Sequence, residues 1–174
     1  MTVDDGRALG AGLLERAKNI LLTPKTEWDA IADEPATVQG LYTRYAMILA
    51  ALQAIGTLVS NLGFLSWANM FGGPFGVHVS VSPVWALLEA VKDYVISLAM
   101  VYVLALIFDG LATNFGATRS RIQALKVSTY SATAFWIAGF FMIVPPLGWL
   151  LGIAACFYTV YLIYLGLRRV MLAP

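Results

Sequence analysis

The residues from Gln123 to Arg169 read QALKVSTYSATAFWIAGFFMIVPPLGWLLGIAACFYTVYLIYLGLRR. They contain two apolar runs of about twenty residues, and at about 1.5 Å of rise per residue each run can cross a hydrocarbon core of about 30 Å. Only Pro145-Pro146-Leu147-Gly148 separates the runs, so the two helices must lie antiparallel and side by side. Neither run carries a charged residue in its interior. This pattern predicts a polytopic membrane protein.

The composition of the whole chain also indicates a membrane protein. Of the 174 residues, 60% are hydrophobic and 12% are charged, and the mean hydropathy is +0.77. Soluble domains carry about 25% charged residues, so this chain is depleted in charge. Its net charge is +1, which offers no basic surface for nucleic acid. The length suits one bundle of a few helices, without a separate soluble catalytic domain.

The sequence predicts an all-α fold, a transmembrane helix bundle with four spans. We expect these spans at residues 41–63, 84–108, 122–144 and 147–168. They form a transmembrane domain over residues 41–174, and residues 1–40 form a cytoplasmic segment in front of it. The connector between the first two spans, residues 64–83, is rich in glycine, proline and aromatic residues. We expect it to rest at the membrane interface.

The cytoplasmic segment carries two amphipathic helical patterns. The first, over residues 6–22, gathers its leucines and Ile20 on one side and its charged residues largely on the other, and Thr23-Pro24 ends it. The second is shorter and ends before Pro35. Two interpretations stay open, namely helices that lie on the lipid headgroups and helices that pack on the rest of the protein. The lipid contacts expected from the first interpretation are Arg16, Lys18, Lys25 and Trp28.

The lysine and arginine residues predict the orientation in the membrane. Nine of the eleven fall in the chain before residue 41, in residues 109–126 and at residues 168–169, while Arg44 lies just inside the first span and Lys92 within the second. A four-span arrangement puts all three segments on one side. Residues 64–83 and 144–148, on the other side, have none. Because cytoplasmic loops are rich in lysine and arginine, we expect both termini in the cytoplasm.

The second predicted span contains the charged residues Glu89, Lys92 and Asp93. If the membrane begins at Pro83, Lys92 lies about 14 Å along the helix, near the midplane. The three side chains would then line a polar intramembrane path, as in a small transporter or channel. If the helix instead projects by two turns, they form an ion pair at the outer interface, with Lys92 reaching toward water. The sequence leaves both interpretations open.

Patterns of catalysis and cofactor binding are missing from the sequence. It has no phosphate-binding loop, no dinucleotide fingerprint and no cluster of histidine and cysteine, and it contains one histidine in all. We therefore predict no enzyme activity, no catalytic residue, no cofactor and no metal. The function that remains is a non-enzymatic membrane protein that organises lipids or partners. A protein partner and a homo-oligomer both stay open.

Several stretches, in order along the chain, resemble the Yip family, membrane proteins named for Ypt/Rab-interacting relatives, in its bacterial branch. They are LLTPKTEWDAIADE at residues 21–34, residues 115–116 with 123–126, and residues 145–149 with Tyr158, Tyr161 and residues 164–166. The family-motif positions are Pro24, Trp28, Lys126, Pro145, Gly148, Tyr158, Tyr161 and Gly166. The resemblance covers most of the chain and implies an all-helical, multi-span protein of the bacterial inner membrane. It implies no reaction, and the vesicle-traffic role of eukaryotic relatives is not carried over.

Two departures from the family pattern affect these expectations. Thr133-Ala134 stands where many relatives have Thr-Pro, so we expect the family's helix kink to be absent. The chain ends at Pro174, where relatives commonly continue into a fifth span. The four-span prediction therefore treats that span as absent or truncated.

Overall fold

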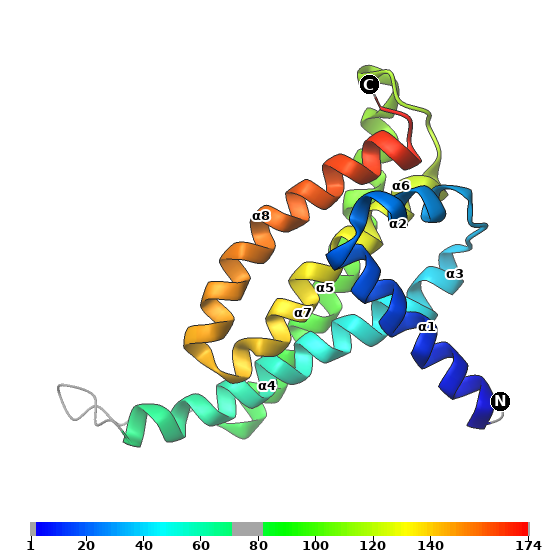
Figure 1. Ribbon diagram of the computed structural model, residues 1–174. Helices are drawn as coiled ribbons and strands as arrows, with labels where there is room; N and C mark the ends of the chain where they lie inside the picture. Colours follow the sequence, from blue (N-terminus) through cyan, green and yellow to red (C-terminus); the bar gives the residue numbers. More distant parts are fainter. Residues whose placement is uncertain (1–2, 71–81, 174) are drawn as a thin grey trace.

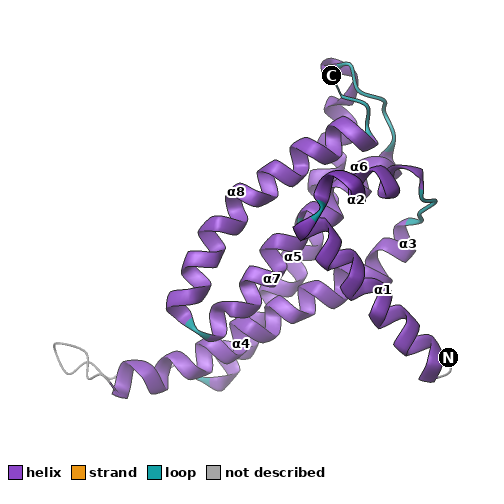
Figure 2. Ribbon diagram, in the orientation of Figure 1, coloured by secondary structure: helices purple, strands orange, loops and turns teal. Residues whose placement is uncertain are grey.

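The computed structural model describes residues 3–70 and 82–173, and every regular element in them is helical (Figure 2). The elements are α1 (Val3–Leu22), α2 (Pro24–Asp33), α3 (Val38–Leu41), the π turn η1 (Tyr42–Ala46), α4 (Met47–Met70), α5 (Pro83–Leu111), the 3-10 turn η2 (Ala112–Phe115), α6 (Arg121–Ser131), α7 (Thr133–Phe140), the 3-10 turn η3 (Phe141–Ile143) and α8 (Pro145–Val170). Helices α4, α5, α7 and α8 run alongside one another, and α1 and α2 cross the end of the bundle where α8 finishes (Figure 1).

Three helical stretches in the described residues are long and apolar enough to cross a membrane. They are Val38–Gly63, Pro83–Asn114 and Pro146–Val170. Large apolar side chains on their outer faces are exposed, among them Ile55, Val95 and Phe157. Such a surface suits lipid rather than water. These stretches coincide with three of the four predicted spans.

The remaining predicted span, residues 122–144, is not one continuous helix. Helices α6 and α7 meet at Ala132, and neither is long enough to cross a membrane alone. The hydroxyl of Thr133 donates a hydrogen bond to the carbonyl oxygen of Tyr130 at 2.7 Å, a local bond that tends to bend a helix. The helix is thus interrupted at Ala132 although no proline stands there, and the expected absence of the family's kink stays a prediction. The four-span arrangement stays a prediction.

Most of α6, the first half of the broken helix, lies inside the protein. Every residue of α6 from Ala124 to Ser131 is buried, although this stretch includes a lysine and several hydroxyls. The hydroxyl of Ser128 donates to the carbonyl oxygen of Val101 on α5 at 2.5 Å. Polar residues and irregular backbone are tolerated at membrane depth when protein surrounds them, which explains why this segment looks less apolar than its neighbours.

The predicted hairpin between the last two runs is confirmed. Helices α7 and α8 pack against each other, with η3 and the extended residue Val144 between them (Figure 1). Gly148 lies so close to the preceding turn that a Cβ atom there would stand 2.6 Å from the Cα of Met142. The turn therefore requires glycine at this position.

The entry to the first span differs from a plain helix. Between α3 and α4 the backbone forms one π turn, Tyr42–Ala46, a feature found frequently at functional sites. At the other end α4 continues to Met70, so the helix takes up the first part of the connector expected at residues 64–83. Residues 71–81 of that connector lie outside the described residues.

Candidate functional site

A buried lysine joins the N-terminal segment to the bundle. The Lys126 ammonium donates hydrogen bonds to the carbonyl oxygens of Ile31 at 2.8 Å, Ala32 at 3.4 Å and Glu34 at 2.5 Å. These carbonyls belong to the end of α2, where a helix has no internal partners for them and where its dipole favours a cation. Lys126 is only 3% exposed. It therefore caps α2 from within α6.

Trp28 fills the space between α2 and the two helices beneath it. Its side chain is 0% exposed and meets the ring of Tyr130 edge-on, with 6.4 Å between the ring centroids. On the other side it faces Gly166 of α8, where a Cβ atom would stand 2.9 Å from Trp28 Cη2 and 3.0 Å from Val127 Cγ1. The absence of a side chain at Gly166 thus makes room for the indole ring.

Helix α8 holds both N-terminal helices through polar contacts. The Tyr158 hydroxyl donates a 2.7 Å hydrogen bond to the carbonyl oxygen of Leu21, at the end of α1. Nearer the end of α8, Arg169 Nη1 lies 3.4 Å from Asp29 Oδ1 of α2. We call the side chains of Trp28, Lys126 and Tyr158, together with Gly166, the anchor residues.

Arg16 links α1 to α2. Its guanidinium lies 2.7 Å from Glu27 Oε1 and also pairs with Glu34, and its Cζ is 5.7 Å from the centroid of the Tyr130 ring. Burial opposes the charge on the guanidinium, but the neighbouring tyrosine and the two carboxylates outweigh it, so the pKa of Arg16 is raised above its ordinary value. Arg16 therefore stays charged and ties the two surface helices together.

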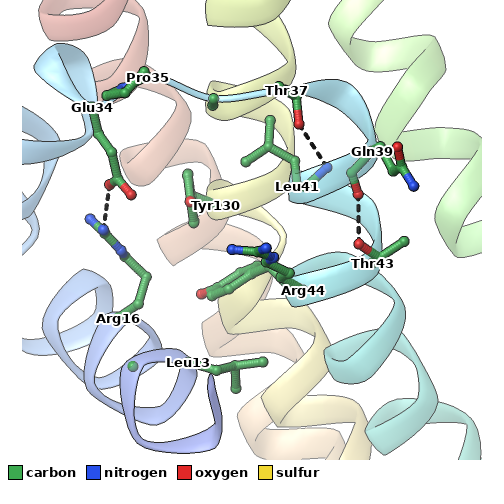
Figure 3. Close-up of a pocket in the computed structure, with 14 residues that line it drawn as sticks. Leu13, Arg16, Glu34, Pro35, Thr37, Gln39, Leu41, Thr43, Arg44 and Tyr130 are labelled. Carbon is green, nitrogen blue, oxygen red and sulfur yellow. Dashed lines mark hydrogen bonds and ion pairs between the residues drawn. The ribbon is translucent and has the colours of Figure 1, made fainter. Parts of the chain in front are cut away.

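A cleft of about 630 Å³ opens beside Arg16. Its walls are α1, the chain between α2 and α3, and the π turn at the start of the first span, and Tyr130 lies on its inner side (Figure 3). Arg16 and Arg44 approach it from opposite walls (Figure 3). Their charges and the tyrosine rings give the cleft a mixed polar and aromatic lining.

Comparison with known proteins identifies the family. The model of the Yip1 domain matches residues 18–174. This chain belongs to the Yip1 family. It is 29% identical over 149 residues to the inner membrane protein YohC of Escherichia coli K12, covering 83% of this chain and 72% of that relative. YohC from a second Escherichia coli strain matches equally, and no solved structure matches. The three apolar helices fit a family of membrane proteins.

The positions expected from the resemblance to the Yip family serve two structural purposes here. Trp28, Lys126, Tyr158 and Gly166 come together as the anchor residues. The other four positions shape the helices around them: Pro24 and Pro145 begin α2 and α8, Gly148 packs in the hairpin turn, and the ring of Tyr161 lies beside that of Tyr158. Four of the eight expected positions thus take part in the attachment of the N-terminal segment in this chain.

The four residues expected to contact lipid occupy different surroundings. Trp28 has no surface left for lipid, so we assign it to packing within the protein. Arg16 is half-buried in its ion pairs. Lys18 and Lys25 are exposed and form no ion pair with any described residue. Contact with lipid headgroups stays an expectation for these two lysines.

The charged cluster of α5 is separate from this site. Lys92 pairs with Glu89, and its Nζ lies 3.9 Å from Asp93 Oδ1. All three side chains keep part of their surface exposed, and none lines the cleft beside Arg16 or the apolar pocket between α4 and α5. Their partners all lie on α5 itself, so these contacts give no support to a polar path between helices.

Sequence reasoning singled out Lys126 as a basic residue and a motif position but missed its contacts. The signal available was a lone lysine beside a hydroxyl-rich, weakly apolar stretch, which indicates burial with a specific partner. Nothing local identified the end of α2 as that partner, because more than ninety residues separate Lys126 from Ile31.

Proposed function

We propose that this Yip1-family chain is a non-enzymatic multi-pass protein of the bacterial inner membrane whose N-terminal segment organises a lipid or protein partner at the cytoplasmic surface. The observation that carries the proposal is the capping of α2 by Lys126. A surface segment held in one arrangement before it meets its partner loses less conformational entropy on binding. The exposed lysines Lys18 and Lys25 add positive charge to that surface.

Four crossings with both termini in the cytoplasm complete the proposal. Residues 121–143 rise by about 34 Å if α6 and α7 are taken together, which is enough for one crossing. Contacts among the basic segments support their lying on one side. The backbone N–H of Thr118 donates to the carbonyl oxygen of Met171 at 2.7 Å, and Arg169 lies beside Asp29.

Recovery of bound partners tests the function. Affinity-purified full-length protein is compared with a Lys18→Glu/Lys25→Glu variant, whose changes touch no ion pair of the described residues. Arg168→Glu is the control, an exposed arginine at the same end of the bundle that contacts Tyr164. We expect a specific protein or lipid to be lost from the double variant and from a chain lacking residues 1–35, and to remain with Arg168→Glu. Equal recovery from all four proteins contradicts the proposal.

A further inference from the structure

The cleft beside α1 holds an arginine that forms no direct ion pair with any described residue. Arg16, on one wall, is already paired with Glu27 and Glu34. Arg44, on the opposite wall, is exposed and has no ion-pair partner among the described residues. An anion that enters the cleft can therefore pair with Arg44 without displacing an existing partner.

The local backbone holds Arg44 at the cleft. Arg44 belongs to the π turn Tyr42–Ala46, and the next residue, Tyr45, is buried with its hydroxyl 2.8 Å from Thr133 Oγ1 of α7. On the preceding residue the Thr43 hydroxyl donates to the Gln39 carbonyl oxygen at 2.8 Å. With both neighbours fixed, the guanidinium of Arg44 lies at the edge of the cleft (Figure 3).

The surface next to the cleft is apolar. Arg44 lies six residues into the membrane-length stretch Val38–Gly63, and the exposed side chains of Met47 and Ile48 follow on the next turn. A ligand with one anionic group and a hydrocarbon chain satisfies both surfaces, because its charge meets Arg44 while its chain runs along α4. A free anion would pair with Arg44 but would not cover the apolar surface along α4.

We propose that this cleft binds the phosphodiester group of a membrane glycerophospholipid, with Arg44 as the residue that pairs with the phosphate. The inference rests on the proposed lipid-organising function and names its ligand. The planar guanidinium of arginine offers two parallel hydrogen bonds to phosphate oxygens. The ion-paired group of Arg16, Glu27 and Glu34 carries one negative charge in excess, and this excess repels a singly charged phosphodiester less than a more highly charged headgroup. A volume of about 630 Å³ is within the range of sites for small ligands.

Native mass spectrometry of the full chain in mild detergent tests the site, with dioleoylphosphatidylglycerol as the probe. The proteins are the wild type, Arg44→Gln and the matched control Arg168→Gln, and dioleoylglycerol is the probe that lacks phosphate. We expect Arg44→Gln to weaken phosphatidylglycerol binding about tenfold, the effect of losing a hydrogen bond to a charged group. We expect Arg168→Gln to bind like the wild type and dioleoylglycerol to bind far more weakly than phosphatidylglycerol.

Three results overturn the assignment. If Arg44→Gln binds phosphatidylglycerol as tightly as the wild type and melts at the same temperature, Arg44 is not part of the site. Equal affinity for dioleoylglycerol means that the apolar surface binds without the phosphate. Displacement of the lipid by excess inorganic phosphate identifies a soluble phosphate as the ligand. If any of these occurs while Lys18→Glu/Lys25→Glu still loses its partner, the cleft assignment fails and the proposed function stands.

Discussion

Lys126 is a charged residue inside a helix bundle, and its burial is compensated by three backbone carbonyls at the end of α2. Lys126→Met keeps most of the hydrocarbon but removes every donor, leaving the carbonyls of Ile31 and Glu34 without their partner. We expect the free energy of unfolding to fall by about 2 kcal/mol or more. The measurement is the melting temperature of purified protein in detergent, with the exposed Lys18→Met as the control. Equal melting temperatures of Lys126→Met and Lys18→Met would show that the capping of α2 by Lys126 does not stabilise the fold.

A substitution at Gly166 tests the packing around Trp28 by its effect on thermal stability. In Gly166→Ala the added methyl group would lie 2.9 Å from Trp28 Cη2, so the indole or α8 must shift. Overpacking of this kind costs about 1–3 kcal/mol. Gly152→Ala is the matched control on the same helix, because nothing lies within 4 Å of a Cβ atom there. We expect thermal unfolding of Gly166→Ala at a lower temperature than Gly152→Ala, and the opposite order contradicts the packing.

At the scale of elements, the sequence was sufficient wherever a local signal determines a helix. The first amphipathic helix ends before Thr23-Pro24 as expected, and the long apolar runs became α4, α5 and α8. The break between α6 and α7 could not be predicted from the same signals. A hydroxyl such as that of Ser128 can bond to its own helix or to a neighbour, and only the assembled bundle brings the carbonyl of Val101 within 2.5 Å.

The hydroxyl of Thr133 provides a test of that break. It donates to the Tyr130 carbonyl oxygen at 2.7 Å and lies 2.8 Å from the Tyr45 hydroxyl. Thr133→Val preserves the shape of the side chain but leaves the Tyr130 carbonyl and the Tyr45 hydroxyl without this hydrogen-bond partner. We therefore expect the free energy of unfolding to fall by about 1–3 kcal/mol. Thr159→Val is the control, because the buried hydroxyl of Thr159 has no partner among the described residues. Chemical unfolding in detergent should give Thr133→Val a lower free energy of unfolding than Thr159→Val. Equal free energies would contradict a stabilising role of the Thr133 hydrogen bonds.

Helix α5 gives a prediction about transport. Since Lys92 pairs with Glu89 and Asp93 of its own helix, we expect proteoliposomes to pass ions and protons no faster than empty liposomes. Glu89→Gln and Lys92→Met should fold like the wild type and leave the flux unchanged. Flux above the empty-liposome level that both variants reduce would instead assign these residues to a polar path.

At the scale of the whole molecule, the sequence predicted an all-helical Yip-like membrane protein, and the Yip1 match confirms the family. The three membrane-length helices confirm the expected architecture in part. The sequence could not reveal that Trp28, Lys126 and Gly166 meet, because their contacts join segments separated by most of the chain. Motif positions scattered along a sequence acquire a shared role only once α2 lies across α6 and α8.

The number of crossings can be measured with single cysteines. Cys156 is the one native cysteine, so Cys156→Ala provides a background for single cysteines at Lys25, Thr118, Leu147 and Leu172. With four crossings and cytoplasmic termini, a membrane-impermeant maleimide should label only Leu147→Cys in cells whose outer membrane is permeabilised. The other three positions should require disruption of the inner membrane.

Leu147 and Leu172 distinguish this arrangement from one with three crossings. If α6 and α7 do not cross together, Leu147 stays on the same side as Thr118, and α8 then carries Leu172 to the opposite side. The labelling pattern at these two positions would be reversed, with Leu172→Cys reactive from outside and Leu147→Cys protected. Since most of α6 is buried and only Ala132 separates it from α7, we expect the pair to act as one crossing and Leu147→Cys to be labelled.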